Sequence, residues 1–259
     1  MRYTSDLTET EWNLIDYCFP KPSKKGRPRE HEVRELVNAI FYLVKTACQW
    51  RNLPTHFAPW STVYHYFRTW KRNGLWARIH HHLREHLRVV EGRQRQASAG
   101  IIDSQSVKST ETSDERGYDA GKKVNGRKRH ILVDTIGPIL LVMVLPANIQ
   151  DRDGARQLLA AFFARTPRRR VKHIWADGGY AGALLAWARK LWRCTIEIVK
   201  RSDLHTFKVL PRRWVVERTF GWLGRSRRLN RDYERQAQTG ETIVYLAMIR
   251  LMLARLGRP

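Results

Sequence analysis

Two aspartates close short apolar segments of the kind that form buried strands. Asp103 ends the run Ile-Ile-Asp, and Asp177 ends Ile-Trp-Ala-Asp just before the pair Gly178–Gly179. Apolar runs that stop at an acid and a turn signal predict carboxylates presented at the end of a sheet. Glu217 differs, because the spacing around it predicts a helix whose packing stripe lies about 100° away. From that flank, Glu217 could lean over the sheet toward the two aspartates.

Three carboxylates brought together repel one another unless cations neutralise them, and hard oxygen ligands suit Mg²⁺ or Mn²⁺. Two such ions, about 3.5–4 Å apart, can activate an attacking oxygen and stabilise the leaving oxygen of a phosphodiester. Taken singly, Asp103 could be a helix cap, Asp177 a turn-former and Glu217 an ion-pair partner of Arg213. The order and contexts of the three acids together favour the metal site. Asp134 is a further acid in a strand context that could join it.

The charge balance indicates a polyanionic partner. The 259 residues carry 48 Lys and Arg against 24 Asp and Glu, a net charge of +24, which favours nucleic acid or an anionic membrane surface. No run approaches the ~18 apolar residues of a membrane span, and the N-terminus has no hydrophobic signal region, so the membrane interpretation falls away. Cys18, Cys48 and Cys194 are odd in number and lack CxxC spacing, as expected of free thiols in a reducing cytosol. We therefore expect a cytoplasmic, nucleoid-associated protein.

Residues 1–91 are predicted to form an all-helical domain, followed by a polar linker over 92–99. Helices are expected over about Glu30–Thr46, Thr62–Arg72 and about Leu75–Val90. In the second of these, Val63, Phe67 and Trp70 form a packing stripe, whereas the other faces carry polar and basic side chains. That division is typical of the recognition helix of a helix-turn-helix, although a solvated basic face looks the same. The candidate DNA contacts are His65, Arg68, Thr69 and Arg72.

Residues 100–259 alternate between the two periodicities and predict an α/β domain with a mixed sheet. Strands are expected over Ala99–Asp103, Arg127–Asp134, Ile139–Pro146, His173–Asp177 and Thr195–Lys200. Helices are expected over Asp151–Ala164, Gly182–Lys190, Arg212–Arg228 and Glu241–Leu256.

Two basic clusters could hold DNA phosphates, although such clusters are often only solvated. One lies within Arg116–His130 and supplies Lys122, Lys123, Arg127, Lys128 and Arg129. The other surrounds Glu217 and supplies Arg213, Arg218, Arg225 and Arg228.

Longer motifs resemble the DDE transposases of bacterial insertion sequences, most closely the insertion-sequence family numbered five. The N-terminal part carries GRPR, CQWRNLP and PWSTVYHYFRTWKRNGLW. The centre carries IIDSQSVK, GKKVNGRKRHILVDTIG and NIQDRDGA, and the C-terminal part ADGGYAG and RRWVVERTFGWLGRSRRL. These motifs follow one another in order over most of the chain.

The resemblance implies a ribonuclease-H-like catalytic domain and a triad of Asp103, Asp177 and Glu217 that binds two Mg²⁺ or Mn²⁺ ions. Related families also carry a Tyr, Arg and Lys set around the Glu. Arg213 matches the Arg, but Leu210 stands at the Tyr position. Gly224 stands at the downstream basic position, which leaves the neighbouring Arg225, or alternatively Arg227 or Arg228, to serve there.

The function implied is transposition. The helical domain would bind the terminal inverted repeats of the element, and the catalytic domain would cleave double-stranded DNA and join the 3′ ends to target DNA. A homodimer or larger assembly on DNA is implied, because two ends must be held together. A domesticated DNA-binding regulator and a metal-dependent nuclease without strand transfer are the alternatives.

Overall fold

The chain was analysed as a computed structural model, which describes residues 3–21, 29–165, 170–199 and 213–258. It divides into two compact units. Unit 1 contains residues 1–91, 223–230 and 242–259, and unit 2 contains residues 92–222 and 231–241. The change of unit after Glu91 falls where the linker was expected. The C-terminal part differs from the expected single domain over 100–259, because two of its segments group with the N-terminal helices.

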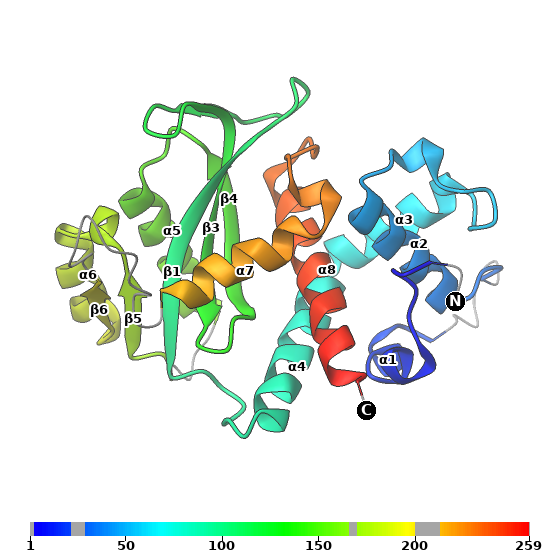
Figure 1. Ribbon diagram of the computed structural model, residues 1–259, viewed down its shortest axis with the longest axis horizontal. Helices are drawn as coiled ribbons and strands as arrows, with labels where there is room; N and C mark the ends of the chain where they lie inside the picture. The colour runs from blue at the N-terminus through cyan, green and yellow to red at the C-terminus, as the bar shows by residue number, and fades with distance from the viewer. Residues whose placement is uncertain (1–2, 22–28, 166–169, 200–212, 259) are drawn as a thin grey trace. The chain divides into compact units, whose positions relative to one another are not determined.

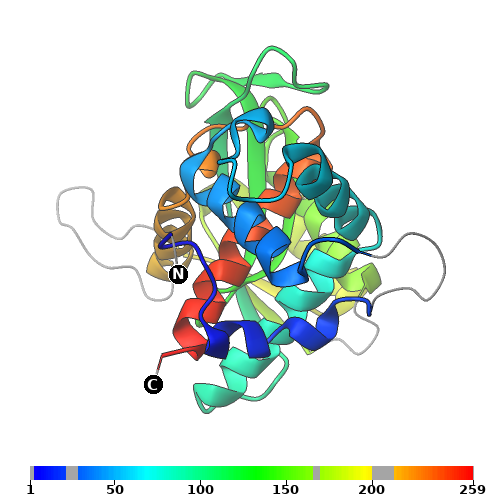
Figure 2. The same ribbon diagram turned by 90° about the vertical axis from the view of Figure 1, so that its right-hand side faces the viewer.

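Unit 1 is helical (Figure 2). Its elements are α1 (Glu9–Asn13), η1 (Asp16–Cys18), α2 (Val33–Thr46), η2 (Trp50–Asn52), α3 (Trp60–Arg72), α4 (Leu75–Val90), η4 (Arg227–Leu229) and most of α8 (Ala237–Leu256). A capping box formed by Thr8 and Glu11 begins α1, and Ala47, in the left-handed conformation, ends α2. The three longer N-terminal helices were predicted, although α2 starts at Val33 rather than near Glu30.

The apolar stripe of each helix forms the core of unit 1. Val63, Phe67 and Trp70 of α3 are at most 1% exposed, as their spacing predicted. The stripe of α4 is buried as far as Leu87, but Val90, predicted to continue it, is 63% exposed because the helix ends there. The C-terminal segment joins this unit through polar contacts as well. Arg250 donates to Glu11 at 2.7 Å and to the carbonyl of Ser5 at 3.2 Å.

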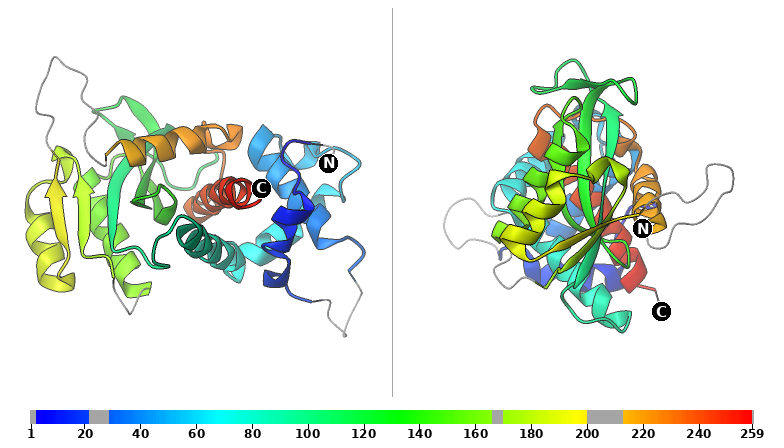
Figure 3. Two further views of the ribbon diagram at one scale, coloured as in Figure 1. Left: turned by 60° about the horizontal axis from the view of Figure 1, so that its bottom comes forward. Right: turned by 90° about the vertical axis from the view of Figure 1, so that its left-hand side faces the viewer.

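Unit 2 is built on a six-stranded mixed sheet (Figure 1). Its strands are β1 (Ala99–Lys108), β2 (Gly117–Asp119), β3 (Val124–Asp134), β4 (Ile139–Pro146), β5 (His173–Ala176) and β6 (Thr195–Ile198). β3 pairs antiparallel with β1, β2 and β4, whereas β1, β5 and β6 run parallel to one another in that order. β6 is the edge strand on that side (Figure 3).

The helices of unit 2 are α5 (Asp151–Arg165), η3 (Gly178–Tyr180), α6 (Ala183–Trp192) and α7 (Trp214–Gly224, which passes into unit 1 after Trp222). Apolar residues of α5 and α6 pack with Ile102, Leu132 and Ile174 of the sheet to form its core. α7 crosses the opposite face (Figures 1 and 3). It ends at Gly224, earlier than the predicted helix, whose first residue lies outside the described ranges. No helix in the ranges described is long and apolar enough to cross a membrane.

Candidate active site

Asp103 and Asp177 occupy equivalent places on neighbouring parallel strands. β1 and β5 pair with Ile101 opposite Trp175, so continuing the register by two residues sets Asp103 opposite Asp177. Neighbouring strands lie about 4.8 Å apart and side chains two residues apart share a face. Both carboxylates therefore lie on the face that α7 crosses. A backbone amide holds each one: Ser104 N donates to Asp103 at 2.7 Å and Gly179 N to Asp177 at 2.8 Å.

Arg213 connects the aspartates to Glu217 on α7. Its Nη2 atom lies 3.7 Å from Asp177 Oδ2 and 3.8 Å from Glu217 Oε1. The Arg213 side chain is 16% exposed, whereas that of Glu217 is 60% exposed. The guanidinium is thus fixed between an acid of the sheet and an acid of the helix, and Glu217 keeps one side open to solvent.

The electrostatic environment favours additional positive charge at this place. Burial, together with repulsion from Asp177, raises the pKa of Asp103 to about 6, although the Ser104 amide and the positive charges of Arg213 and Lys122 oppose the rise. Burial also raises the pKa of the Tyr180 hydroxyl well above its usual value, and the negative charges of Asp103, Asp151 and Asp177 add to that effect. Burial is thus the main reason that the charged form of Asp103 is disfavoured, and a cation bound beside it would offset part of that cost.

Two of the three acids, Asp103 and Asp177, are arranged as ligands of a divalent cation would be, whereas Glu217 is not. Asp103 and Asp177 supply hard carboxylate oxygens side by side, and a cation would relieve their mutual repulsion. Within the described ranges, no three His, Cys, Asp or Glu side chains come close enough to form a ready metal site. Glu217 stands off from the aspartates, with Arg213 between them.

A group of buried polar residues supports Asp103 from the other face of the sheet, and sequence reasoning missed it. Ser104 Oγ donates to Asp151 at 2.7 Å, and Lys128 Nζ lies 3.1 Å from Asp151 and 3.3 Å from Asp119. Burial alone would raise the pKa of Asp119, but a hydrogen bond from Ser106 and the ammonium of Lys128 help to bring it down to about 2. The sequence did show the two acids, Asp119 in GYDAG and Asp151 in NIQDRDGA, but both lie outside the apolar runs that were interpreted as strands.

Three residues predicted to contact DNA are buried. Arg127, Lys128 and Arg129 are 0%, 5% and 2% exposed, respectively. Lys128 also donates to the carbonyl of Ile149 at 2.9 Å. Burial lowers the pKa of Arg129 to about 10, with Asp232 opposing the shift, so its guanidinium stays charged at neutral pH. These three side chains therefore lie inside the fold and are not accessible to DNA.

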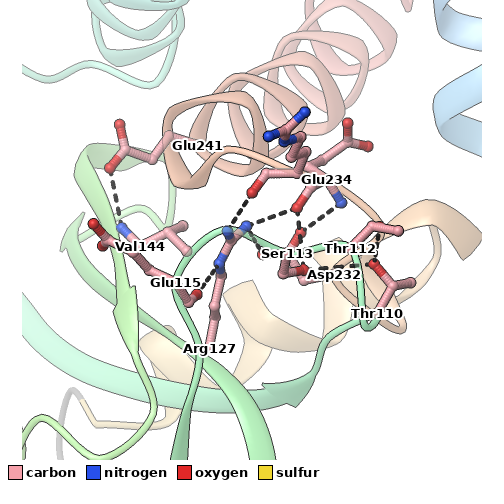
Figure 4. Close-up of polar contacts among 10 residues, drawn as sticks. Thr110, Thr112, Ser113, Glu115, Arg127, Val144, Asp232, Glu234 and Glu241 are labelled. Carbon is pink, nitrogen blue, oxygen red and sulfur yellow. Dashed lines mark hydrogen bonds and ion pairs between the residues drawn. The ribbon is translucent and has the colours of Figure 1, made fainter.

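Arg127 joins β3 to the C-terminal segment (Figure 4). It donates to the carbonyls of Glu115 and Glu234, each at 2.8 Å, and to that of Arg235 at 2.5 Å. It also forms an ion pair with Asp232 at 3.5 Å, in which both side chains are 1% exposed. A buried charge held by so many acceptors stabilises the fold, because removing it would leave them unsatisfied.

The remaining predicted basic residues lie in different places. Lys122 and Lys123 are exposed next to β3, and the positive charge of Lys122 acts on Asp103. Arg218 stacks between Trp214 and Trp222 at 4.3 and 4.4 Å from the ring centroids. Arg225 and Arg228 belong to unit 1, where Arg225 is exposed and Arg228 is buried and donates to the carbonyl of Cys48 at 3.0 Å.

The other candidates are separated from the acids or lie in unit 1. Asp134 is fully buried at the last residue of β3, opposite Gly100 and three residues beyond Ile131, the partner of Asp103; its carboxylate accepts from the amide of Ile136 in the turn to β4. The predicted recognition residues of α3, His65, Arg68, Thr69 and Arg72, are all exposed.

Comparison with known proteins identifies the family of this chain. Residues 94–252 match the family described as "Transposase DDE domain", and residues 7–80 match "Putative transposase of IS4/5 family". The first match covers more than half of the chain, so the protein belongs to the DDE transposases. The second match covers a smaller, N-terminal part of the chain, and its description agrees with the resemblance seen in the sequence.

Two relatives come from Burkholderia cepacia. "Putative transposase for insertion sequence element IS402" is 34% identical over 120 residues, which are 43% of this chain and 56% of that protein. "Insertion element IS402 uncharacterized 16.2 kDa protein" is 31% identical over 103 residues, which are 38% of this chain and 69% of that protein. The matched part thus spans just over half the length of the first relative. A solved structure, "Crystal structure of the Mos1 Strand Transfer Complex", aligns over 93% of this chain and 82% of its own with 13% identity and a TM-score of 0.24, too low to support a structural conclusion.

Proposed function

We propose that the protein cleaves DNA at the ends of its own insertion sequence and joins the 3′ ends to target DNA. The observation that supports the proposal is that the β1–β5 register, extended by two residues, leads to Asp103 beside Asp177, and that Arg213 lies within 4 Å of Asp177 and Glu217. Membership of the DDE family supports the same assignment of the three acids.

In this proposal, Asp103, Asp177 and Glu217 hold two divalent ions, Mg²⁺ or Mn²⁺. Bound there, the ions would activate the attacking oxygen and stabilise the leaving oxygen of a phosphodiester. Arg213 partly neutralises the charges of Asp177 and Glu217, and it keeps Glu217 directed toward the sheet. The backbone amides of Ser104 and Gly179 fix the rotamers of the aspartates.

The reaction has two steps. Water adds to the phosphodiester at the element end, leaving a 5′-phosphate and a free 3′-hydroxyl. That hydroxyl then attacks a target phosphodiester, so that one P–O bond forms, another breaks, and the displaced target strand leaves with a new 3′-hydroxyl. Catalysis by this chain consists of positioning and charge stabilisation, without a covalent protein intermediate.

The fold assignments extend the same proposal. The sheet has four strands in antiparallel pairs, β1 to β4, followed in sequence by α5 and by two strands parallel to β1, and this order supports a ribonuclease-H-like domain. In unit 1, the exposed polar face of α3 opposite its buried stripe supports a helix-turn-helix that binds the inverted repeats. A homodimer or larger assembly on double-stranded DNA in the cytoplasm completes it.

One assay separates this function from the alternatives. Purified protein would be incubated with labelled inverted-repeat DNA, a target plasmid and Mg²⁺. Joined products are expected for the wild type, whereas Asp103→Asn, Asp177→Asn and Glu217→Gln should each abolish chemistry and keep DNA binding. Cleavage without joining would indicate a nuclease. Binding alone, unchanged by Asp177→Asn, would indicate a DNA-binding regulator and overturn the catalytic proposal.

A further inference from the structure

A basic pocket lies on unit 2 at the far end of β1 from the paired aspartates. It is open to solvent and has a volume of about 340 Å³. Four cations line it, Lys108, Arg116, Lys123 and Arg231, against a single acid, Glu111. All four are exposed, in contrast to the buried Arg127 and Arg129 nearby. The pocket therefore concentrates positive charge that solvent and an anionic ligand can reach.

Segments far apart in the sequence build this pocket. Lys108 ends β1, Lys123 precedes β3, and Arg231 comes from the segment that follows α7 and η4. That segment runs beside the end of β1, because Asp232 N donates to the carbonyl of Lys108 at 2.9 Å and Asp232 bridges Ser109. Arg231 itself donates to the carbonyl of Ser109 at 3.0 Å, which directs its guanidinium along the pocket wall.

The buried Arg127 explains why the C-terminal segment stays in place. Figure 4 shows Arg127 reaching from β3 to Asp232 and to the carbonyl of Glu234. Because Asp232 directly follows Arg231, this clamp fixes one wall of the pocket against the sheet. Arg231 is consequently positioned before any ligand arrives, which lowers the entropic cost of binding at this wall.

The lining matches a nucleic-acid strand. Four cations suit phosphate oxygens, which only accept hydrogen bonds. Tyr118, 55% exposed, offers an aromatic face to a sugar or base, and Asn125 adds an amide donor. We propose that this pocket binds the phosphodiester backbone of DNA. A carboxylate-rich protein would satisfy the cations but would leave no role for the exposed ring.

The position of the pocket suits the DNA that the acids would cut. Lys108 lies five residues after Asp103 on β1, a separation of roughly 16 Å at the rise of a β-strand; because the spacing is odd, its side chain starts from the other face, and DNA would reach it at the end of the strand. That length corresponds to about five base pairs of duplex at 3.4 Å each. This inference rests on the proposed function for the identity of the DNA, and it adds an anchor for the backbone away from the reacting bond.

The test is the salt dependence of DNA binding. Fluorescence anisotropy would give the Kd of the full chain for a labelled random-sequence duplex between 50 and 300 mM NaCl. In the double variant Arg116→Ala/Lys123→Ala, we expect affinity at low salt to fall about 10²-fold and the slope of log K against log salt to fall by about 1.8, because two phosphate contacts are lost. The matched control is Arg189→Ala/Lys190→Ala, which removes the same charge from the exposed end of α6 and should keep the slope.

The following outcomes would contradict the proposal that DNA binds in this pocket. Equal losses in both double variants would mean that only net charge matters, and an unchanged slope in the pocket variant would mean that DNA does not contact it. Inorganic phosphate and a deoxynucleoside monophosphate serve as competitors at 1 mM, a concentration chosen for the experiment at roughly the upper end of ordinary small-ligand affinities. Binding of phosphate to the wild type but not to the pocket variant, without displacement of DNA from the wild type, would identify a small-phosphate site instead.

Failure of this inference is distinguishable from failure of the proposed function. If the wild type joins DNA and the pocket variant keeps the wild-type salt slope, the proposed DNA contact at the pocket is wrong and the proposed function stands. A reduced slope in the pocket variant, with wild-type protein that never cleaves, would keep the pocket and remove the function. Absence of any DNA binding by the wild type would remove both.

Discussion

At the scale of single residues, Arg213 is the group on which the candidate active site depends most. Three acids gathered without compensating charge would repel one another, and this guanidinium lies within 4 Å of two of them. Its position, one helical turn before Glu217, lets it reach back to Asp177 from the start of α7. We assign it the task of holding sheet and helix acids in one place.

Replacing this guanidinium should slow the chemistry. Arg213→Gln is expected to reduce single-turnover cleavage of inverted-repeat DNA by roughly 10²-fold, as for other losses of a positioned charge. Arg213→Lys should recover only part of the rate, since an ammonium is a single point charge. Arg189→Gln is the control, and a cleavage rate in Arg213→Gln equal to that of the control would refute the assignment.

The sequence singled out the acids but did not show which of the neighbouring cations are buried. Asp103 and Asp177 stood out because each follows a short apolar run, although β1 does not end at Asp103 as expected but continues to Lys108. Arg127 and Arg129 could not be separated from Lys122 and Lys123, because their burial depends on acceptors more than 100 residues away, such as Asp232 and the carbonyl of Glu234. Charge can be read from residue types, whereas access to solvent comes from tertiary contacts.

At the scale of elements, the missing side chain of Gly154 lets α5 pack closely against the sheet. A Cβ atom at Gly154 would lie 2.2 Å from the ring of His130, which is 0% exposed and has no room to move aside. Gly221 in α7 is the opposite case, since nothing lies within 4 Å of the position of its Cβ atom. The same residue type therefore serves close packing in one helix and has no such role in the other.

This contrast predicts opposite effects of one substitution. Gly154→Ala should lower the free energy of unfolding by about 1–3 kcal/mol, because the overpacked ring must shift. Gly221→Ala should raise it by up to about 1 kcal/mol, the ordinary gain in a helix. Urea unfolding at pH 7.5 measures both, and a stabilised Gly154→Ala variant would contradict the packing described here.

α3 carries the prediction for sequence recognition. Arg68 is exposed on the side away from the buried Val63 and Phe67. Arg68→Ala should weaken binding to the inverted repeat by about 1–3 kcal/mol, with a smaller loss on random duplex, if its guanidinium contacts a base edge. Competition binding measures the ratio, with Arg93→Ala as the control. Equal losses on both DNAs would reduce Arg68 to a phosphate contact.

Strand lengths show why element boundaries were less predictable. The apolar run at Ile101–Ile102 marked the start of β1, but the strand continues through the polar residues Ser104 and Ser106 to Lys108. Those serines are satisfied by Asp151 and Asp119, respectively. Hydrophobic periodicity cannot detect a strand that is stabilised by buried hydrogen bonds.

At the scale of the whole molecule, buried histidines make stability depend on pH. Burial lowers the pKa of His130 to about 4 and that of His80 well below its usual value. Both are neutral in the folded chain at neutral pH, whereas the unfolded chain takes up protons below about pH 6.5. Stability is therefore fully present above that pH and falls as the pH drops toward 4, by about 3 kcal/mol for His130 alone.

Unfolding by urea at pH 7.5 and pH 5.0, in EDTA, tests this dependence. The wild type should lose stability at the lower pH, and His130→Gln should lose less. Asp103 acts in the opposite direction: its pKa is raised to about 6, so its contribution is present below its unfolded pKa and lost as pH rises through 6. Asp103→Asn should consequently steepen the loss on acidification. Identical pH dependence in the wild type and His130→Gln would contradict the assignment.

The path of the chain between the two units has a consequence for synthesis. Unit 1 begins with residues 1–91 but also needs segments 223–230 and 242–259. Lys45 donates to the carbonyl of Arg225, and Glu11 accepts a hydrogen bond from Arg250, which is translated near the end of the chain. On the ribosome, the N-terminal helices must therefore remain incomplete while the rest of the polypeptide is made, which takes on the order of ten seconds or more at ordinary elongation rates. A messenger terminated before residue 241 would yield neither unit whole, and one terminated between 241 and 259 would still leave unit 1 without part of its last segment.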